Sequence, residues 1–142
     1  MTTSSASATW EGGLKSGRGT FQAGSGAFQG AYSFPTRFES AKGTNPEELI
    51  AAAHAACLSM ALSAGLEKAG TPATRVTTRA SCTIDMVGGG PKITTMKLEV
   101  RGKVSGITPE AFAKAAEEAK NGCPVSGALK GNVTFVLEAK LE

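Results

Sequence analysis

The sequence predicts an α+β fold formed by a single domain over residues 1–142, an antiparallel β-sheet with a buried central helix and shorter C-terminal helices. A long apolar run that starts at a helix-start signal predicts the central helix, and an alternating pattern on both sides of a glycine-rich turn predicts a β-hairpin. Short strand patterns precede the central helix and follow the hairpin. The resulting order β-β-β-α-β-β-α-α-β argues for helices gathered on one face of the sheet. The length suits one hydrophobic core.

The first 40 residues contain three strand-like pieces separated by glycines, at 8–10, 19–22 and 31–39. Pro35 lies inside the third piece. Because proline has no N–H to donate to a β-ladder, we expect this piece to be an edge strand or to break at Pro35.

The clearest helix start follows, with Asn45 as the cap, Pro46 at the first helical position and Glu48 three residues after the cap. These signals predict a helix from Pro46 to about Lys68. Its residues leave almost no polar face, so we expect it to be buried on most sides. Its many alanines permit close packing, and a second subunit is expected to supply part of the cover, which predicts a homodimer.

The hairpin is predicted from residues 74–86 and 94–104, whose apolar residues alternate on either side of the turn Gly88-Gly89-Gly90-Pro91. Thr108 and Pro109 then open a second helix that is expected to end near Asn121-Gly122. Pro124 opens a short third helix. The alternation over 133–141 predicts a final strand with Val133, Phe135, Leu137, Ala139 and Leu141 on one face.

Composition excludes several classes of function. The net charge is +3, the pI is about 8.9, and the Lys and Arg residues are spread along the chain, so a nucleic-acid partner is not expected. We find no N-terminal signal and expect no apolar run of membrane-spanning length. The sequence therefore predicts a soluble, cytoplasmic protein without a membrane partner.

The three cysteines, Cys57, Cys82 and Cys123, are the main candidates for chemistry. In a reducing cytoplasm a structural disulfide is not expected, and three cysteines cannot all pair within one chain, so any disulfide would be transient and catalytic. Cys82 faces the same side as Val76 and Ile84 and is interpreted as core filling.

Cys57 lies about three turns into its helix, beyond the reach of the helix dipole. Lowering its pKa from about 8.5 to about 6 requires roughly 3 kcal/mol of preference for the thiolate, which a guanidinium in a dry site would supply. Without such a group, Cys57 is interpreted as a buried, inert cysteine. Cys123 precedes Pro124 at a helix start, where unpaired N–H groups and the dipole contribute about 0.3 to 1 kcal/mol. From the residues alone, a chance cap and a functional thiol are equally good interpretations of Cys123.

A zinc site is the rival interpretation, because His54 and Cys57 are spaced i, i+3 and would be joined by Cys82 and Cys123. The chain has no CxxC pair and one histidine, so we expect no metal and interpret His54 as a polar residue near a helix surface or interface. The sequence also lacks a nucleophile elbow, a P-loop and a dinucleotide-binding fingerprint.

Three runs carry a resemblance over essentially the whole chain: Thr36-Arg37-Phe38-Glu39, the segment Gly43 to Cys57, and Gly122-Cys123-Pro124-Val125-Ser126. They resemble the osmotically inducible protein C (OsmC) branch of the OsmC/Ohr thiol peroxidases. The resemblance implies an intertwined homodimer with two active sites at the subunit interface. It also implies reduction of hydroperoxides to alcohols, organic hydroperoxides in preference to hydrogen peroxide, in the defence against oxidative or osmotic stress.

By this resemblance, Cys57 is the peroxidatic cysteine that becomes a sulfenic acid, and Cys123 resolves it as an intramolecular disulfide. Their Cα atoms must then approach within about 7 Å, which would place the third helix beside the first. Arg37 matches the arginine that stabilises the thiolate and the leaving alkoxide, and Glu47 the carboxylate that orients it. No cofactor is implied, but an external dithiol is required, such as a lipoyl protein or a thioredoxin-type protein.

About 15 Å of helix axis separates Glu47 from Cys57, so we expect an arginine, a partner chain or an altered helix start to bridge the gap. Arg18, within Ser16-Gly17-Arg18-Gly19, is the alternative activator, because the Ohr branch takes its arginine from a similar position. Without the resemblance, Glu47 would only complement the helix dipole and Arg37 would be a solvated edge charge.

Two further points remain open at this stage. A non-enzymatic redox sensor or an apolar-ligand-binding protein is the alternative function. If the chain is an enzyme, an apolar mouth lined by some of Phe34, Phe38, Leu58 and Met60 would favour alkyl hydroperoxides.

Overall fold

The computed structural model describes all residues, 1–142, and divides into two parts, Met1–Leu49 and Ile50–Glu142, which are considered separately. The chain combines four helices with six strands, so the predicted α+β class is confirmed. Within one chain the strands form two three-stranded sheets, β1-β2-β3 and β4-β5-β6. The prediction of one antiparallel sheet was therefore wrong.

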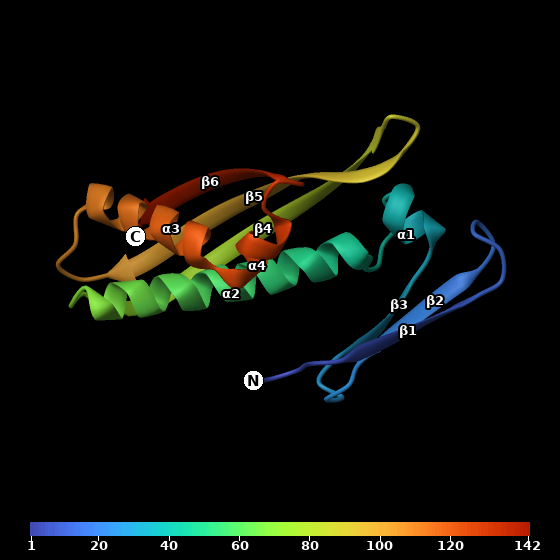
Figure 1. Cartoon of the computed structure of the whole chain (residues 1–142), viewed down its shortest axis with the longest axis horizontal. Helices are drawn as coiled ribbons and strands as arrows, with labels where there is room; N and C mark the ends of the chain where they lie inside the picture. Colours follow the sequence, from blue (N-terminus) through green and yellow to red (C-terminus); the bar gives the residue numbers. More distant parts are fainter. The chain divides into compact units, whose positions relative to one another are not determined.

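The first part holds an antiparallel meander of β1 (Ala6–Glu11), β2 (Arg18–Ala23) and β3 (Gln29–Tyr32), drawn in blue in Figure 1. It is followed by a short helix, α1 (Phe34–Phe38). The strand expected over 31–39 therefore ends at Tyr32.

A capping box explains why the chain turns helical at this point. The Thr36 N–H donates to Ser33 Oγ at 3.3 Å, and the Ser33 N–H donates to Thr36 Oγ1 at 2.9 Å. Pro35 lies in the first helical turn, where its missing N–H costs no hydrogen bond. Local capping thus outweighs the strand-like pattern of residues 31–39.

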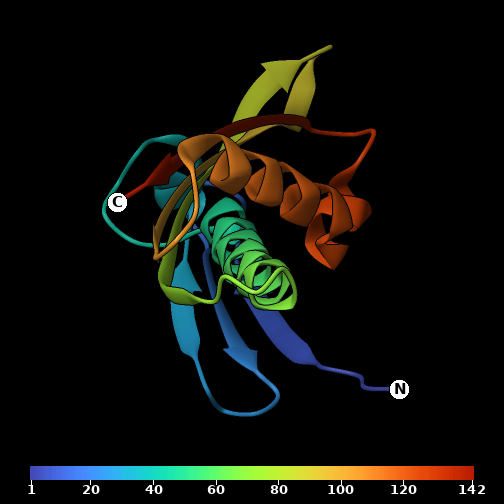
Figure 2. The same cartoon turned by 90° about the vertical axis from the view of Figure 1, so that its left-hand side faces the viewer.

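Helix α2 (Pro46–Lys68) has the predicted bounds, and Asn45 caps it by accepting from the Glu48 N–H at 2.9 Å. The remaining elements are β4 (Ala73–Val87), β5 (Gly90–Val104), α3 (Pro109–Gly122), α4 (Pro124–Leu129) and β6 (Thr134–Leu141). Their order and approximate bounds agree with the prediction, and β4 pairs antiparallel with β5 as expected. Figures 1 and 2 show α2 and α3 on the same side of this sheet.

The last strand departs from the expected topology, because β6 runs parallel to β5, with Thr95 opposite Thr134 and Gly102 opposite Leu141. The chain leaves β5, crosses the sheet through α3 and α4, and re-enters in the same direction. Parallel neighbours require such a crossover, whereas a short turn joins antiparallel ones. Alternation along a strand does not reveal the direction of its neighbour.

The core of the second part lies between helices and sheet. Leu58, Leu62 and Leu66 of α2 are fully buried there. They pack in one cluster with β5 and α3, whose buried members are Met96, Leu98, Val100, Val104, Phe112, Ala116 and Ala119. Ridges of side chains from α2 and α3 thus meet the apolar face of the sheet.

The opposite side of α2 is exposed within a single chain. Met60 is 78% exposed, and Ala52, Ala53 and Ala56 are exposed beside it. The expectation that α2 is buried on most sides is therefore not met by the chain alone. This apolar side of α2 is called the open face below.

By length and composition, α2 is apolar enough to cross a membrane, which contradicts the expectation that no run approaches that length. Such a result is weak evidence for a membrane span, because the core helix of a soluble protein passes the same test. The buried leucines of α2 pack against the sheet, as those of a core helix do.

Packing at Gly102 leads to a first prediction. A Cβ added to this residue would overlap the ring of Phe112, which is fully buried in the core. We expect Gly102→Ala to lower the free energy of unfolding by about 1 to 3 kcal/mol. Gly65→Ala in α2 is the matched control, since a Cβ there meets no atom within 4 Å and alanine favours a helix. Urea unfolding of both variants measures the effect, and equal midpoints would contradict the predicted overlap.

Candidate active site

Two cysteines far apart in the sequence meet in the second part of the chain. The thiol of Cys57, on α2, lies within hydrogen-bonding reach of the Cys123 thiol. Cys57 is partly exposed, whereas Cys123 is buried. The arrangement places a solvent-accessible sulfur beside a sequestered one.

Cys123 occupies the junction between α3 and α4. Its N–H donates to Ala119 O at 2.9 Å and closes α3, while its own carbonyl accepts from the Gly127 N–H at 3.0 Å and opens α4. Pro124 takes the first position of α4, as predicted. The backbone is thus fixed on both sides of the sulfur.

The surroundings of the two thiols shift their pKa values in opposite directions. Burial raises the pKa of Cys57, and its hydrogen bond to Cys123 raises this pKa further, against a smaller opposing effect of the Val125 N–H. Burial also acts to raise the pKa of Cys123, but hydrogen bonds from Cys57, from the Ser126 N–H and hydroxyl, and from the Val125 N–H outweigh it and lower this pKa. Within a single chain Cys123 is therefore the more acidic of the two thiols, and Cys57 needs a further positive group to ionise readily.

His54 is buried, with no exposed surface, so its placement near a helix surface was wrong. Its Nε2 lies 2.7 Å from Ser126 Oγ, and its ring meets Phe135 edge to face at 5.6 Å. Burial lowers the pKa of His54, which favours the neutral imidazole. Nδ1 has no hydrogen-bond partner.

Ser126 and its pairing with His54 were not predicted from the sequence, although one signal pointed to each residue. It lies at the third position of the helix that Cys123 caps, where a side chain can reach back to the cap residue. His54 also lies one helical turn before Cys57, and therefore on the same side of α2.

The zinc interpretation would require Cys82 to join His54, Cys57 and Cys123. Cys82 instead packs against the hydrophobic core from β4, as expected. No group of three His, Cys, Asp or Glu side chains lies close enough together to hold a metal ion.

In the first part of the chain, Arg37 and Glu47 form an ion pair. Arg37 Nη2 donates to Glu47 Oε1 at 2.8 Å, and Arg37 Nε donates to the same oxygen at 3.2 Å. The Glu47 side chain is 5% exposed and that of Arg37 is 35% exposed. The interpretations of Arg37 as a solvated edge charge and of Glu47 as a mere complement to the helix dipole are therefore both wrong.

Local structure explains how the pair forms. Arg37 lies in the last turn of α1, and Glu47 in the first turn of α2. Asn45 Nδ2 donates to Thr36 O at 3.0 Å, which holds the end of α1 near the start of α2. The guanidinium also lies over the Phe38 ring, 5.3 Å from its centroid. Arg18, the alternative activator, is exposed at the start of β2.

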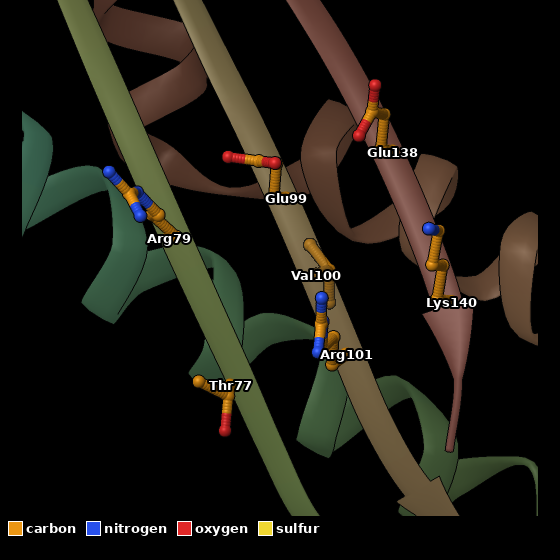
Figure 3. Close-up of a pocket in the computed structure, with 7 residues that line it drawn as sticks. All are labelled: Thr77, Arg79, Glu99, Val100, Arg101, Glu138 and Lys140. Atoms are coloured by element: carbon orange, nitrogen blue, oxygen red, sulfur yellow. The ribbon is translucent and has the colours of Figure 1, made fainter.

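The outward face of the sheet in the second part has a shallow depression, shown in Figure 3. It is lined by Thr77 and Arg79 of β4, Glu99, Val100 and Arg101 of β5, and Glu138 and Lys140 of β6. Charges of both signs alternate there, and Lys97 lies between Glu99 and Glu138, at 3.8 and 3.7 Å. This surface faces away from the core and from both redox sulfurs.

One residue of the proposed apolar mouth does not fit. Leu58 is fully buried in the core, so it cannot line a substrate entrance. Met60 and Phe38 are exposed and remain candidates, each within its own part of the chain.

The chain thus contains two chemical groups, one in each of its two parts. They are an oriented guanidinium within residues 1–49 and a dithiol within residues 50–142. The guanidinium supplies a fixed positive charge. The dithiol can form a reversible disulfide. Together these are the parts that a thiol-based reaction with an electrophilic oxygen requires.

Comparisons with known proteins agree with this chemistry. A family model described as OsmC-like protein matches residues 39–138. The chain is 48% identical over 134 residues to peroxiredoxin OsmC of Escherichia coli strain K12, covering 94% of each. It is 35% identical over 99 residues to the organic hydroperoxide resistance protein OhrA of Bacillus subtilis, covering 68% of this chain and 67% of that one.

A solved structure shows the same fold. The crystal structure of an organic hydroperoxide resistance protein from Elizabethkingia anophelis, with bound thiocyanate, is 26% identical and superposes with a TM-score of 0.80, covering 99% of both chains.

Proposed function

The chain belongs to the OsmC family, and we propose that it is a cysteine-based peroxidase that reduces organic hydroperoxides to alcohols, and hydrogen peroxide less well. The observation that carries this function is the meeting of Cys57 and Cys123 in a chain 48% identical to a peroxiredoxin. The activity serves defence against oxidative or osmotic stress.

The reaction begins at Cys57, the accessible sulfur of the pair. Its thiolate attacks the terminal oxygen of the hydroperoxide, an S–O bond forms, the O–O bond breaks, and the leaving alkoxide takes a proton to become the alcohol. Cys57 is then a sulfenic acid. Cys123 attacks this sulfur, an S–S bond forms, and the hydroxyl group leaves as water.

A reductant returns the enzyme to its starting state. An external dithiol attacks the Cys57–Cys123 disulfide through one of its sulfurs. It leaves as a disulfide itself, and Cys57 and Cys123 become thiols again. The chemistry of a lipoyl protein or a thioredoxin-type protein fits this role. The peroxide oxygens are reduced and the protein's own redox changes all occur at sulfur, so the proposed reaction uses no cofactor and no metal.

Arg37 is the proposed activator of Cys57. A guanidinium beside the sulfur stabilises the thiolate and then the developing alkoxide, and Glu47 fixes the direction in which the guanidinium points. Support comes from the hydrogen bonds that Arg37 Nε and Nη2 donate to the buried Glu47 carboxylate. Arg18 is the alternative activator.

The active form is proposed to be an intertwined homodimer with two active sites at the subunit interface. The open face of α2 supports it, because Ala52, Ala53, Ala56 and Met60 would otherwise remain in water. Small alanine side chains allow a second helix to approach closely.

We place the enzyme in the cytoplasm. The support comes from Cys57 and Cys123, which are not joined by a disulfide, as the cycle requires at its start. A reducing compartment would keep them so and would supply the dithiol.

A thiol titration tests the proposed function. Reduced protein treated with one equivalent of an organic hydroperoxide is expected to lose two thiols per chain, and with excess dithiol it is expected to consume many equivalents. Consumption of a single equivalent would mean a redox sensor instead of an enzyme. Retention of all three thiols would contradict both and would favour a binding protein.

A further inference from the structure

His54 and Ser126 lie next to the redox sulfurs without a role in the cycle described above. His54 Nε2 and Ser126 Oγ are 2.7 Å apart and both residues are buried, so no water competes for this hydrogen bond. The Ser126 hydroxyl in turn hydrogen-bonds to Cys123. A continuous chain of contacts therefore runs from the imidazole to the sulfur.

The direction of each hydrogen bond follows from the number of protons. When Cys123 is ionised for its attack, the thiolate can only accept, so in that state the single hydroxyl hydrogen of Ser126 must point to the sulfur. Ser126 Oγ then accepts from His54, and Nε2 must carry the one hydrogen of the neutral imidazole. Nδ1 is left as a bare lone pair, which agrees with the lack of any partner for this atom.

Apart from Ser126, the imidazole contacts an aromatic ring. Phe135 of β6 covers the ring edge to face, and no carboxylate or cation contacts it. A buried polar atom without a hydrogen-bond partner lowers stability, so an imidazole is not the side chain that would stabilise this position most. A phenylalanine would fill the same space without that cost.

We propose that His54 and Ser126 form a buried hydrogen-bond relay that positions Cys123 and supports it as the attacking sulfur in disulfide formation. The proposal rests on the roles assigned to Cys57 and Cys123 above. His54 acts through Ser126 and is a positioning residue, as is Ser126.

The relay acts on one step of the cycle. Cys123 loses its proton, its sulfur attacks the sulfenic sulfur of Cys57, the S–S bond forms and the S–O bond breaks. The departing hydroxide takes up one proton and becomes water, so atoms and charge balance. Hydrogen bonding from Ser126 favours the thiolate before the attack, whereas the attack of Cys57 on peroxide does not involve the relay.

Four variants test the relay. Ser126→Ala removes the hydroxyl, and His54→Phe removes Nε2 but keeps the ring against Phe135. His54→Gln retains an N–H donor within reach of Ser126. Ser59→Ala is the matched control, because Ser59 loses a hydrogen bond of the same length, 2.7 Å to Thr78, on the same helix.

Single-turnover oxidation by one equivalent of an organic hydroperoxide separates the two steps. The first step is measured by trapping the sulfenic acid with dimedone, and we expect it not to slow in any of the four variants, since a less acidic Cys123 does not hinder ionisation of Cys57. Disulfide formation is expected to slow about tenfold in Ser126→Ala and His54→Phe, the effect of losing nine-tenths of the thiolate. His54→Gln and Ser59→Ala should resemble the parent chain.

A second measurement does not depend on turnover. In a Cys57→Ser background, the thiolate absorbance of Cys123 titrates at higher pH when Ser126→Ala or His54→Phe is added. An unchanged titration together with an unchanged rate of disulfide formation would overturn the relay. If the parent chain forms no disulfide, the proposed function fails, and the titration still decides whether the relay acts on Cys123. If His54→Gln behaves like His54→Phe in both assays, the imidazole has no donor role and the relay is wrong.

Discussion

Cys57→Ser is expected to abolish peroxide turnover, with a loss on the order of 10⁴-fold or more, because a serine hydroxyl is not ionised near neutral pH and cannot replace the thiolate as nucleophile. The loss is measured as consumption of an organic hydroperoxide in the presence of excess dithiol. Cys123→Ser should instead retain one peroxide-dependent oxidation at Cys57, detected as a sulfenic acid. The two variants therefore separate attack from resolution.

Cys82→Ser is the matched control, since Cys82 packs in the core and takes no part in the proposed cycle. It should retain turnover. Turnover that persists in Cys57→Ser would reverse the roles of the two sulfurs. Such a reversal has a physical basis. In a single chain the hydrogen bonds around Cys123 lower its pKa, whereas burial raises the pKa of Cys57.

Arg37→Ala is expected to slow the oxidation of Cys57 by about 10²-fold, the rate equivalent of roughly 3 kcal/mol of thiolate and alkoxide stabilisation. The variant loses both the positive charge and the ion pair with Glu47. Stopped-flow measurement of thiol oxidation against hydroperoxide concentration gives the rate constant. Glu47→Gln should cause a smaller loss, because the charge of Arg37 remains and only its orientation is relaxed.

Arg18→Ala is the comparison that decides between the two arginines. Arg18 is exposed at the start of β2, and its removal should leave the rate near that of the parent chain. A normal rate in Arg37→Ala with a slow one in Arg18→Ala would transfer the activating role to Arg18. Arg37→Lys adds a test of geometry, since lysine keeps the charge but cannot reproduce the two hydrogen bonds from one planar group.

Elements with strong local signals were predicted well. Asn45 and Pro46 at the start of α2, Thr108 and Pro109 at the start of α3, and Pro124 at the start of α4 act through their own backbone geometry and neighbouring N–H groups. For residues 31–39 the expected break near Pro35 is confirmed, since the strand ends at Tyr32. The short helix that follows was not predicted, because its start depends on the Ser33 and Thr36 capping pair and not on an apolar pattern.

Other features depend on contacts between distant segments. The direction of β6 relative to β5 depends on the path of the chain through α3 and α4, which no pattern within β6 records. The buried position of His54 depends on Ser126 and Phe135, both far from it in the sequence. Its spacing from Cys57 placed it on the right side of α2 but did not indicate whether that side was covered.

The sequence by itself determined the α+β class, the bounds of α2 and α3, the start of α4 and, through the resemblance of its motifs, the candidate residues Arg37, Glu47, Cys57 and Cys123. It also implied that Cys57 needs an activator, because helix position alone fixes the distance of this sulfur from the helix dipole. The tertiary structure decided which of the two thiols is the more acidic in a single chain, and it brought His54 and Ser126 to Cys123. A pKa is set by burial and by hydrogen-bond donors within a few ångströms, and only the folded chain places those groups around a sulfur.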